Sequence, residues 1–125
     1  MVELTKDMVR RMPKVALHEH LDGGLRPATV IELARDQDVT LPSDDPDTLR
    51  QWFERGANRG SLAEYLEGFA VTCGVMQTEA ALERVAYEAL EDLQADGVAY
   101  AELRFAPQFH CDKELQLEPV MDAVL

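Results

Sequence analysis

Two apolar, strand-like segments stand far apart in this chain, and helical patterns fill the residues between them. The segments are 14–21 (KVALHEHL) and 98–107 (VAYAELRFAP). Strands joined by a long helical crossover pair in parallel, whereas antiparallel neighbours can be joined by a short hairpin. Parallel sheets are covered by helices on both faces, and two strands alone do not make a stable sheet. The sequence therefore predicts the front part of a larger α/β unit.

Short helices are predicted where the chain offers a residue that favours a helix start. Thr5 is a suitable N-cap for a helix that Pro13 ends. Pro27 and Pro119 suit the first turns of two others, because proline lacks the N–H that a first turn leaves unpaired. Another short helix is expected after the polar loop that begins at residue 40, where Leu49, Trp52 and Phe53 follow.

Two longer segments, 61–74 and 78–97, have the strongest helical patterns. Ser61 and Glu64 match a capping box at the start of the first segment. Apolar residues then recur at i, i+3, i+4 and i+7 in both segments, which gives each helix one apolar side. Gly74 and Gly97 are expected to end them.

Charge and cysteine usage exclude several classes of partner. The net charge is −12, from 24 acidic and 12 basic residues spread along the chain. Nucleic-acid backbones and anionic membrane surfaces require clustered Lys and Arg, so neither is an expected partner. Cys73 and Cys111 form no CxxC pair and are predicted to be reduced thiols. No stretch approaches the roughly 20 apolar residues of a membrane span, so a soluble cytoplasmic protein is expected.

His18 and His20 stand one residue apart at the end of the first strand-like segment. Residues i and i+2 of a strand share a face, so both imidazoles should lie beside Ala16, with Leu17 and Glu19 opposite. From there, their ring nitrogens can converge on one ion, and zinc binds neutral imidazole. Alternatively, the rings only cap the strand end and bond to backbone. An unpartnered imidazole in an apolar strand is costly, which favours the metal site.

Residues 13–34, PKVALHEHLDGGLRPATVIELA, resemble the opening of the adenosine deaminase family, which are zinc-dependent (β/α)8 barrels of the amidohydrolase group. Residues 61–108 look like the helical insertion and second barrel strand of that family. The resemblance implies an α/β fold: the N-terminal part of a (β/α)8 TIM barrel of the metal-dependent hydrolase type. Residues 1–125 would be the N-terminal segment of a single barrel domain, with a helical insertion between its first two strands.

The same resemblance assigns roles to individual residues. It implies that His18 and His20 bind one zinc ion, and that His20 and Asp22 contact the substrate, Asp22 at the ribose. Four residues match the apolar wall of the purine pocket, although a helix also needs such a stripe simply to pack: Leu62, Tyr65, Leu66 and Phe69.

Three polar residues receive structural interpretations. Glu19 is expected to face the outer helices of the barrel. Glu102 and Arg104 share a face of the second strand, so an ion pair between them is predicted. His110 follows the carboxyl end of that strand, where barrel active sites lie, but the family gives it no ligand role and a surface-loop histidine is expected.

For the complete protein, the resemblance implies hydrolytic deamination of adenosine or deoxyadenosine by a zinc-activated water, giving inosine or deoxyinosine and ammonia. The catalytic glutamate and further His and Asp residues are expected beyond Leu125, so no catalytic residue is assigned within the segment. The isolated 125 residues are predicted to be inactive. The alternatives are a deaminase of another aminopurine, such as adenine or a modified adenosine, and a non-catalytic helical binding module.

Overall fold

The computed structural model of the chain describes residues 3–58 and 60–125. Its two strands, β1 and β2, pair in parallel, as predicted from the long crossover between them. The elements follow in the order α1 (Lys6–Arg11), β1 (Lys14–His20), η1 (Leu21–Gly23), α2 (Pro27–Gln37), α3 (Pro46–Ala57), α4 (Leu62–Val75), α5 (Glu79–Ala95), β2 (Val98–Arg104), η2 (Pro107–His110) and α6 (Leu117–Val124).

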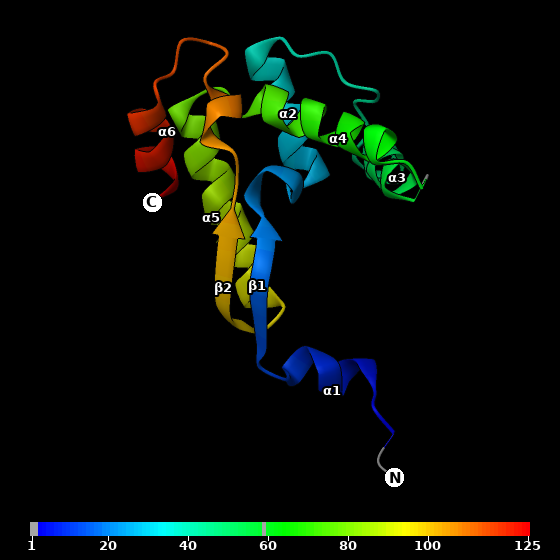
Figure 1. Cartoon of the computed structure of the whole chain (residues 1–125). Helices are drawn as coiled ribbons and strands as arrows, with labels where there is room; N and C mark the ends of the chain where they lie inside the picture. The colour runs from blue at the N-terminus through cyan, green and yellow to red at the C-terminus, as the bar shows by residue number, and fades with distance from the viewer. Residues whose placement is uncertain (1–2, 59) are drawn as a thin grey trace.

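The helices are distributed unevenly around the strand pair (Figure 1). Helix α5 lies behind the strands, whereas α2, α3 and α4 gather beyond the carboxyl ends and α1 stands at the amino ends. The hydrophobic core lies among the helices and includes Leu49, Val75, Met76 and Leu82. One side of the strand pair carries exposed side chains, such as Val15 and Tyr100. The described helices include none that is both long and apolar enough to cross a bilayer.

A β-bulge changes which residues of β1 share a face. Ala16 pairs with Ala101 and Glu19 with Leu103, so three steps along β1 oppose two along β2. The extra residue shifts the alternation of side chains. Ala16 and Glu19 are therefore both half-buried, while His18 and His20 are exposed. The prediction that the histidines lie beside Ala16 and opposite Glu19 was correct for Glu19 and wrong for Ala16.

Most helix starts agree with the sequence, and one predicted end does not. The Thr5 hydroxyl accepts a hydrogen bond from the Met8 N–H at 3.2 Å, so Thr5 is the N-cap of α1. Gly97 follows α5 with φ at +78°, a backbone conformation that glycine adopts without strain. Gly74, predicted to end α4, lies inside it, and α4 continues to Val75. The Ser61 half of the predicted capping box does not form, because the Ser61 side chain makes no capping hydrogen bond.

Candidate metal and substrate site

The carboxyl end of β1 brings two imidazoles together. The Nε2 atoms of His18 and His20 are 3.2 Å apart, and the ring centroids are 5.1 Å apart. Two nitrogen ligands of a tetrahedral zinc ion, each about 2.0–2.1 Å from the metal, lie about 3.4 Å from each other. The observed separation fits that requirement. The pair therefore supplies the donor atoms and the spacing for half of a tetrahedral metal site.

Neighbouring groups fix the orientation of the His20 ring. Its Nδ1 lies 3.6 Å from Oδ1 of Asp22, on the side away from the nitrogen that faces His18. The ring also packs edge-to-face against Phe69 of α4, with centroids 6.0 Å apart. Such outer contacts set the direction in which a ligating imidazole presents its nitrogen.

Asp22 is a buried carboxylate, and only one of its two oxygens accepts a hydrogen bond from the described residues. The turn η1 carries it inward, so that only 4% of the residue is exposed. Its Oδ2 accepts a hydrogen bond from the Ala106 N–H at 3.3 Å, which ties η1 to the residue before η2. Among the described residues, its Oδ1 has no hydrogen-bond partner. Because a buried oxygen without a partner is costly, Oδ1 is available to accept a donor from a bound molecule.

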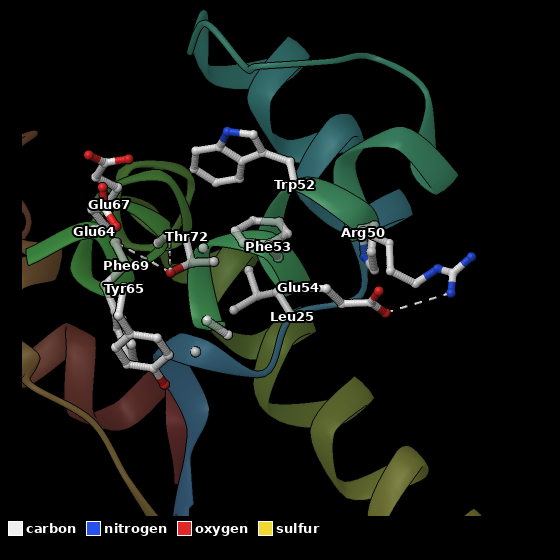
Figure 2. Close-up of a pocket in the computed structure, with 15 residues that line it drawn as sticks. Leu25, Arg50, Trp52, Phe53, Glu54, Glu64, Tyr65, Glu67, Phe69 and Thr72 are labelled. Atoms are coloured by element: carbon white, nitrogen blue, oxygen red, sulfur yellow. Dashed lines mark hydrogen bonds and ion pairs between the residues drawn. The ribbon is translucent and has the colours of Figure 1, made fainter. Parts of the chain in front are cut away.

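A hollow of about 370 Å³ lies beside this turn, between α3 and α4 (Figure 2). Its lining is largely apolar and includes Leu25, Trp52, Phe53, Tyr65 and Phe69. It reaches the histidine site through Gly23 and Phe69, since Phe69 contacts the His20 ring. Charged residues also line the hollow, namely Arg50, Glu54, Glu64 and Glu67. A hollow of this size and lining suits a flat ring with polar atoms at its edge, such as a nitrogen heterocycle.

Of the four residues predicted to form the wall of the purine pocket, two line the hollow and two do not. Tyr65 and Phe69 line the hollow and pack against each other, with centroids 5.6 Å apart. Leu62 and Leu66 do not line it, and Leu62 is 72% exposed. Trp52 and Phe53, predicted only as helix residues, also line the hollow. Their sequence positions give no signal of this, because an apolar residue on a helix does not indicate what it faces.

His110 is not the surface-loop residue that was predicted. It is 0% exposed and its ring lies near Phe105, with centroids 5.7 Å apart. Pro107 begins the turn η2, which carries His110 inward instead of along the surface. Burial lowers the pKa of His110 below its usual value, so that the neutral imidazole is favoured. Asp22 and Cys73 lie beside it.

The predicted Glu102–Arg104 ion pair is also absent from the described part of the chain. The Tyr100 hydroxyl instead donates a hydrogen bond to the Glu102 carboxylate at 3.0 Å. Glu19, in contrast, faces α5 as expected, in a shallow hollow that it lines with Ala89 and Leu93. The two cysteines are free thiols, as predicted.

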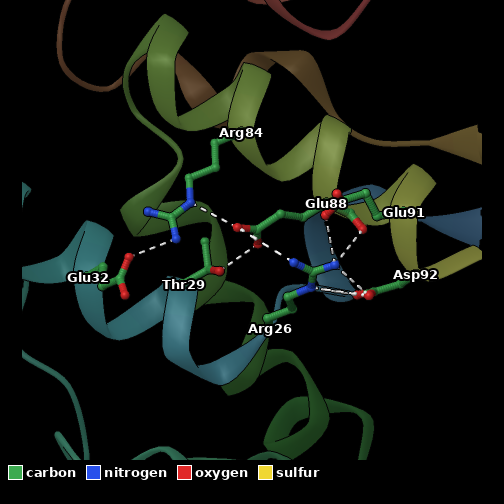
Figure 3. A network of polar contacts seen from close by, with 7 residues as sticks. All are labelled: Arg26, Thr29, Glu32, Arg84, Glu88, Glu91 and Asp92. Carbon is green, nitrogen blue, oxygen red and sulfur yellow. Dashed lines mark hydrogen bonds and ion pairs between the residues drawn. The ribbon is translucent and has the colours of Figure 1, made fainter. Parts of the chain in front are cut away.

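A polar network holds the segment after the site against α5 (Figure 3). Arg26 donates to the Asp92 carboxylate at 2.7 Å and to Glu91 at 3.1 Å. Glu88 accepts hydrogen bonds from Thr29 and from Arg84, the latter at 2.9 Å. Burial opposes the charge of Glu88, but these two hydrogen bonds and the positive charges of Arg84 and Arg26 together outweigh it and hold the pKa of Glu88 below its usual range.

Glu88→Gln is expected to reduce the free energy of unfolding of the complete protein by about 1–3 kcal/mol, since it weakens charge-assisted hydrogen bonds. A lowered folded-state pKa stabilises the protein above the unfolded pKa, about 4.3 for glutamate, and this stabilisation is lost as the pH falls through the folded value. Urea unfolding at neutral and acid pH measures both effects. Glu91→Gln, a more exposed member of the network, should change stability by less than about 1 kcal/mol. An equal loss in both variants would contradict the role given to Glu88.

Comparison with known proteins identifies the family of this chain. A family model described as "Adenosine deaminase" matches residues 13–125. The chain is 56% identical, over 98% of its length, to an adenosine deaminase of Mycobacteroides abscessus. It covers 34% of that relative, so it spans about a third of the length of the curated relatives it matches.

Solved structures share the fold. An adenine deaminase from Arthrobacter aurescens superposes with a TM-score of 0.76 at 30% identity, over 90% of this chain and 33% of that one. An amidohydrolase from Burkholderia ambifaria, solved with bound Zn, superposes with a TM-score of 0.74 at 24% identity. This second match covers 98% of this chain and 34% of that one, and it supports the fold assignment alone.

Proposed function

The chain belongs to the adenosine deaminase family, and on this basis we propose that the complete protein hydrolyses adenosine or deoxyadenosine to inosine or deoxyinosine and ammonia. The described residues form the N-terminal part of the (β/α)8 barrel, with α2, α3 and α4 as the helical insertion between its first two strands. Residues 1–125 are proposed to belong to one barrel domain whose remaining strands complete the site.

The observation that carries the proposal is the 3.2 Å separation of the His18 and His20 Nε2 atoms. In the proposal, both residues hold one zinc ion through these nitrogens. A zinc ion held by these two residues would lower the pKa of a water to near 7, which is the chemistry that activates water at neutral pH. The Asp22 carboxylate and Phe69 keep the His20 ring in place from its other sides.

The burial of Asp22 and its free acceptor oxygen support the proposal that the substrate carries a sugar. Its buried Oδ1 can accept a hydrogen bond from a ribose hydroxyl, with His20 contacting the same molecule. The purine base would then occupy the apolar hollow beside Gly23, against Tyr65 and Phe69. Leu62 and Leu66 are proposed to extend this wall outward along α4, where their exposure leaves them free to cover a bound base.

A second candidate is a deaminase of another aminopurine, because a similar solved structure is an adenine deaminase. Adenine has no sugar hydroxyl for Asp22 to hold. A kinetic panel of adenosine, deoxyadenosine, adenine and N6-methyladenosine, assayed on the complete protein, separates the candidates. We expect the highest kcat/KM for adenosine or deoxyadenosine. Turnover of adenine alone would overturn this choice of substrate.

A further inference from the structure

Three polar side chains from distant parts of the sequence meet beneath the candidate substrate site. They are Asp22 of η1, Cys73 of α4 and His110 of η2, and one polar atom of each lies within 4.8 Å of the others. Asp22 Oδ1 and both ring nitrogens of His110 make no well-formed hydrogen bond among the described residues, although the Met76 backbone lies close enough to the His110 ring to raise its pKa. Buried polar groups in folded proteins are nearly always paired with protein or water, so these atoms are expected to have partners in the complete protein.

The spacing of the cluster permits that pairing. Three atoms within 4.8 Å of one another have a common centre no more than about 2.8 Å from each, which is the hydrogen-bond distance to one water oxygen. Among the described residues, the His110 ring makes no direct hydrogen bond to Asp22 Oδ1, but a single water can bridge the two groups. Each carboxylate oxygen accepts two hydrogen bonds, so this contact leaves room for a substrate hydroxyl at Asp22.

The backbone around His110 is held by a buried amide. Gln77, only 4% exposed, donates hydrogen bonds from its Nε2 to the carbonyl oxygens of Cys73 and Phe109, both at 2.7 Å. Its Oε1 accepts from the Asp112 N–H at 3.0 Å. The residues just before and two after His110 are thus tied to α4. The Ala106 N–H, at the start of the same turn, donates to Asp22 itself.

We propose that His110 is a positioning residue, whose imidazole holds the Asp22 carboxylate in the orientation that accepts a hydrogen bond from the substrate's sugar. The inference rests on the proposed function, since it assigns the sugar contact to Asp22. It also explains why η2 turns inward immediately after β2: the turn delivers a donor to a carboxylate that belongs to the neighbouring strand's loop.

A second metal site is the competing interpretation of the same three residues, and the metal content of Cys73→Ala separates the two. Metal binding requires a cysteine thiolate. Burial and the nearby Asp22 carboxylate raise the pKa of Cys73 to about 11, so without a bound metal the thiol keeps its proton at neutral pH. The Cys73 thiol interacts with the Thr72 side chain, which leaves the His110 imidazole as the member of the cluster that can donate to Asp22.

The kinetic test uses the complete protein and the variants His110→Leu, His110→Gln and Cys73→Ala. His110→Leu is expected to raise KM for adenosine about tenfold with little change in kcat, since it weakens binding that ground state and transition state share. His110→Gln, which keeps an N–H donor, should recover most of that loss. Cys73→Ala is the matched control from the same cluster and should change KM less than about twofold.

A double-mutant cycle separates positioning from a general structural effect. In an Asp22→Ala background, His110→Leu is expected to have no further effect on KM, because its action passes through Asp22. Additive losses in the cycle would overturn the proposal. So would a wild-type zinc content of two ions per chain that falls to one in Cys73→Ala, which would identify a second metal site.

A crystal structure of the complete wild-type protein gives a readout that depends on neither activity nor the folding of a variant. We expect a His110 nitrogen within about 3.2 Å of an Asp22 oxygen, or one water that bonds to both. A ring turned away from Asp22 would overturn the inference. If the wild-type protein fails to deaminate adenosine, the proposed function fails, while this structure still decides whether His110 and Asp22 are paired.

Discussion

Replacing both His18 and His20 with alanine is expected to remove zinc from the complete protein and to abolish deamination of adenosine. Loss of an outer-shell partner alone weakens metal affinity or activity about 10- to 100-fold, so loss of two direct ligands should lower kcat/KM by more than roughly 1000-fold. The physical reason is the 3.2 Å separation of the two Nε2 atoms, which suits shared coordination of one ion. Metal content by mass spectrometry and ammonia release by the same preparations measure the two effects together.

Glu19→Gln is the matched control for this experiment. Glu19 stands between the two histidines but faces α5, beside Ala89 and Leu93. The variant should therefore retain its zinc and most of its activity. Unchanged metal content after loss of both histidines would refute the metal site. It would also favour the alternative in which the histidines are structural and the protein is a non-catalytic binding module.

Asp22→Ala is expected to reduce kcat/KM for adenosine by about 10- to 100-fold, with most of the loss in KM. A hydrogen bond to a charged group is worth about 1.5–3 kcal/mol, and each 1.4 kcal/mol corresponds to a tenfold change. Asp22 is buried and its Oδ1 has no partner among the described residues, so a sugar hydroxyl there would be bound without competition from bulk water. Steady-state kinetics on the complete protein measure the loss.

The substrate itself provides the control for Asp22. Adenosine analogues that each lack one sugar hydroxyl can be assayed on wild type and on Asp22→Ala. For one of these analogues, we expect kcat/KM to be low already in wild type and to fall little further in Asp22→Ala. Equal losses for adenosine and all of these analogues would show that Asp22 acts on stability or on the metal site instead. Glu102→Gln, which alters an exposed carboxylate bonded to Tyr100, should leave kcat/KM unchanged.

The parallel strand pair, the helices and the histidine pair could all be predicted from the sequence, because each depends on local spacing. A crossover too long for a hairpin requires parallel strands, and N-cap residues act within one turn of a helix. His18 and His20 stay together because the alternation of side chains resumes after the extra residue of the bulge.

Tertiary packing decided what those elements enclose. The bulge between Ala16 and Glu19 depends on how β1 meets β2, and Gly74 continues α4 although its sequence position suits a helix end. His110 is buried because η2 folds toward α4 and is held there by Gln77, a residue more than thirty positions earlier in the chain. Only contacts of this kind determine whether a polar side chain meets water or another buried group, because burial and pairing are properties of neighbours in space and not of neighbours in sequence.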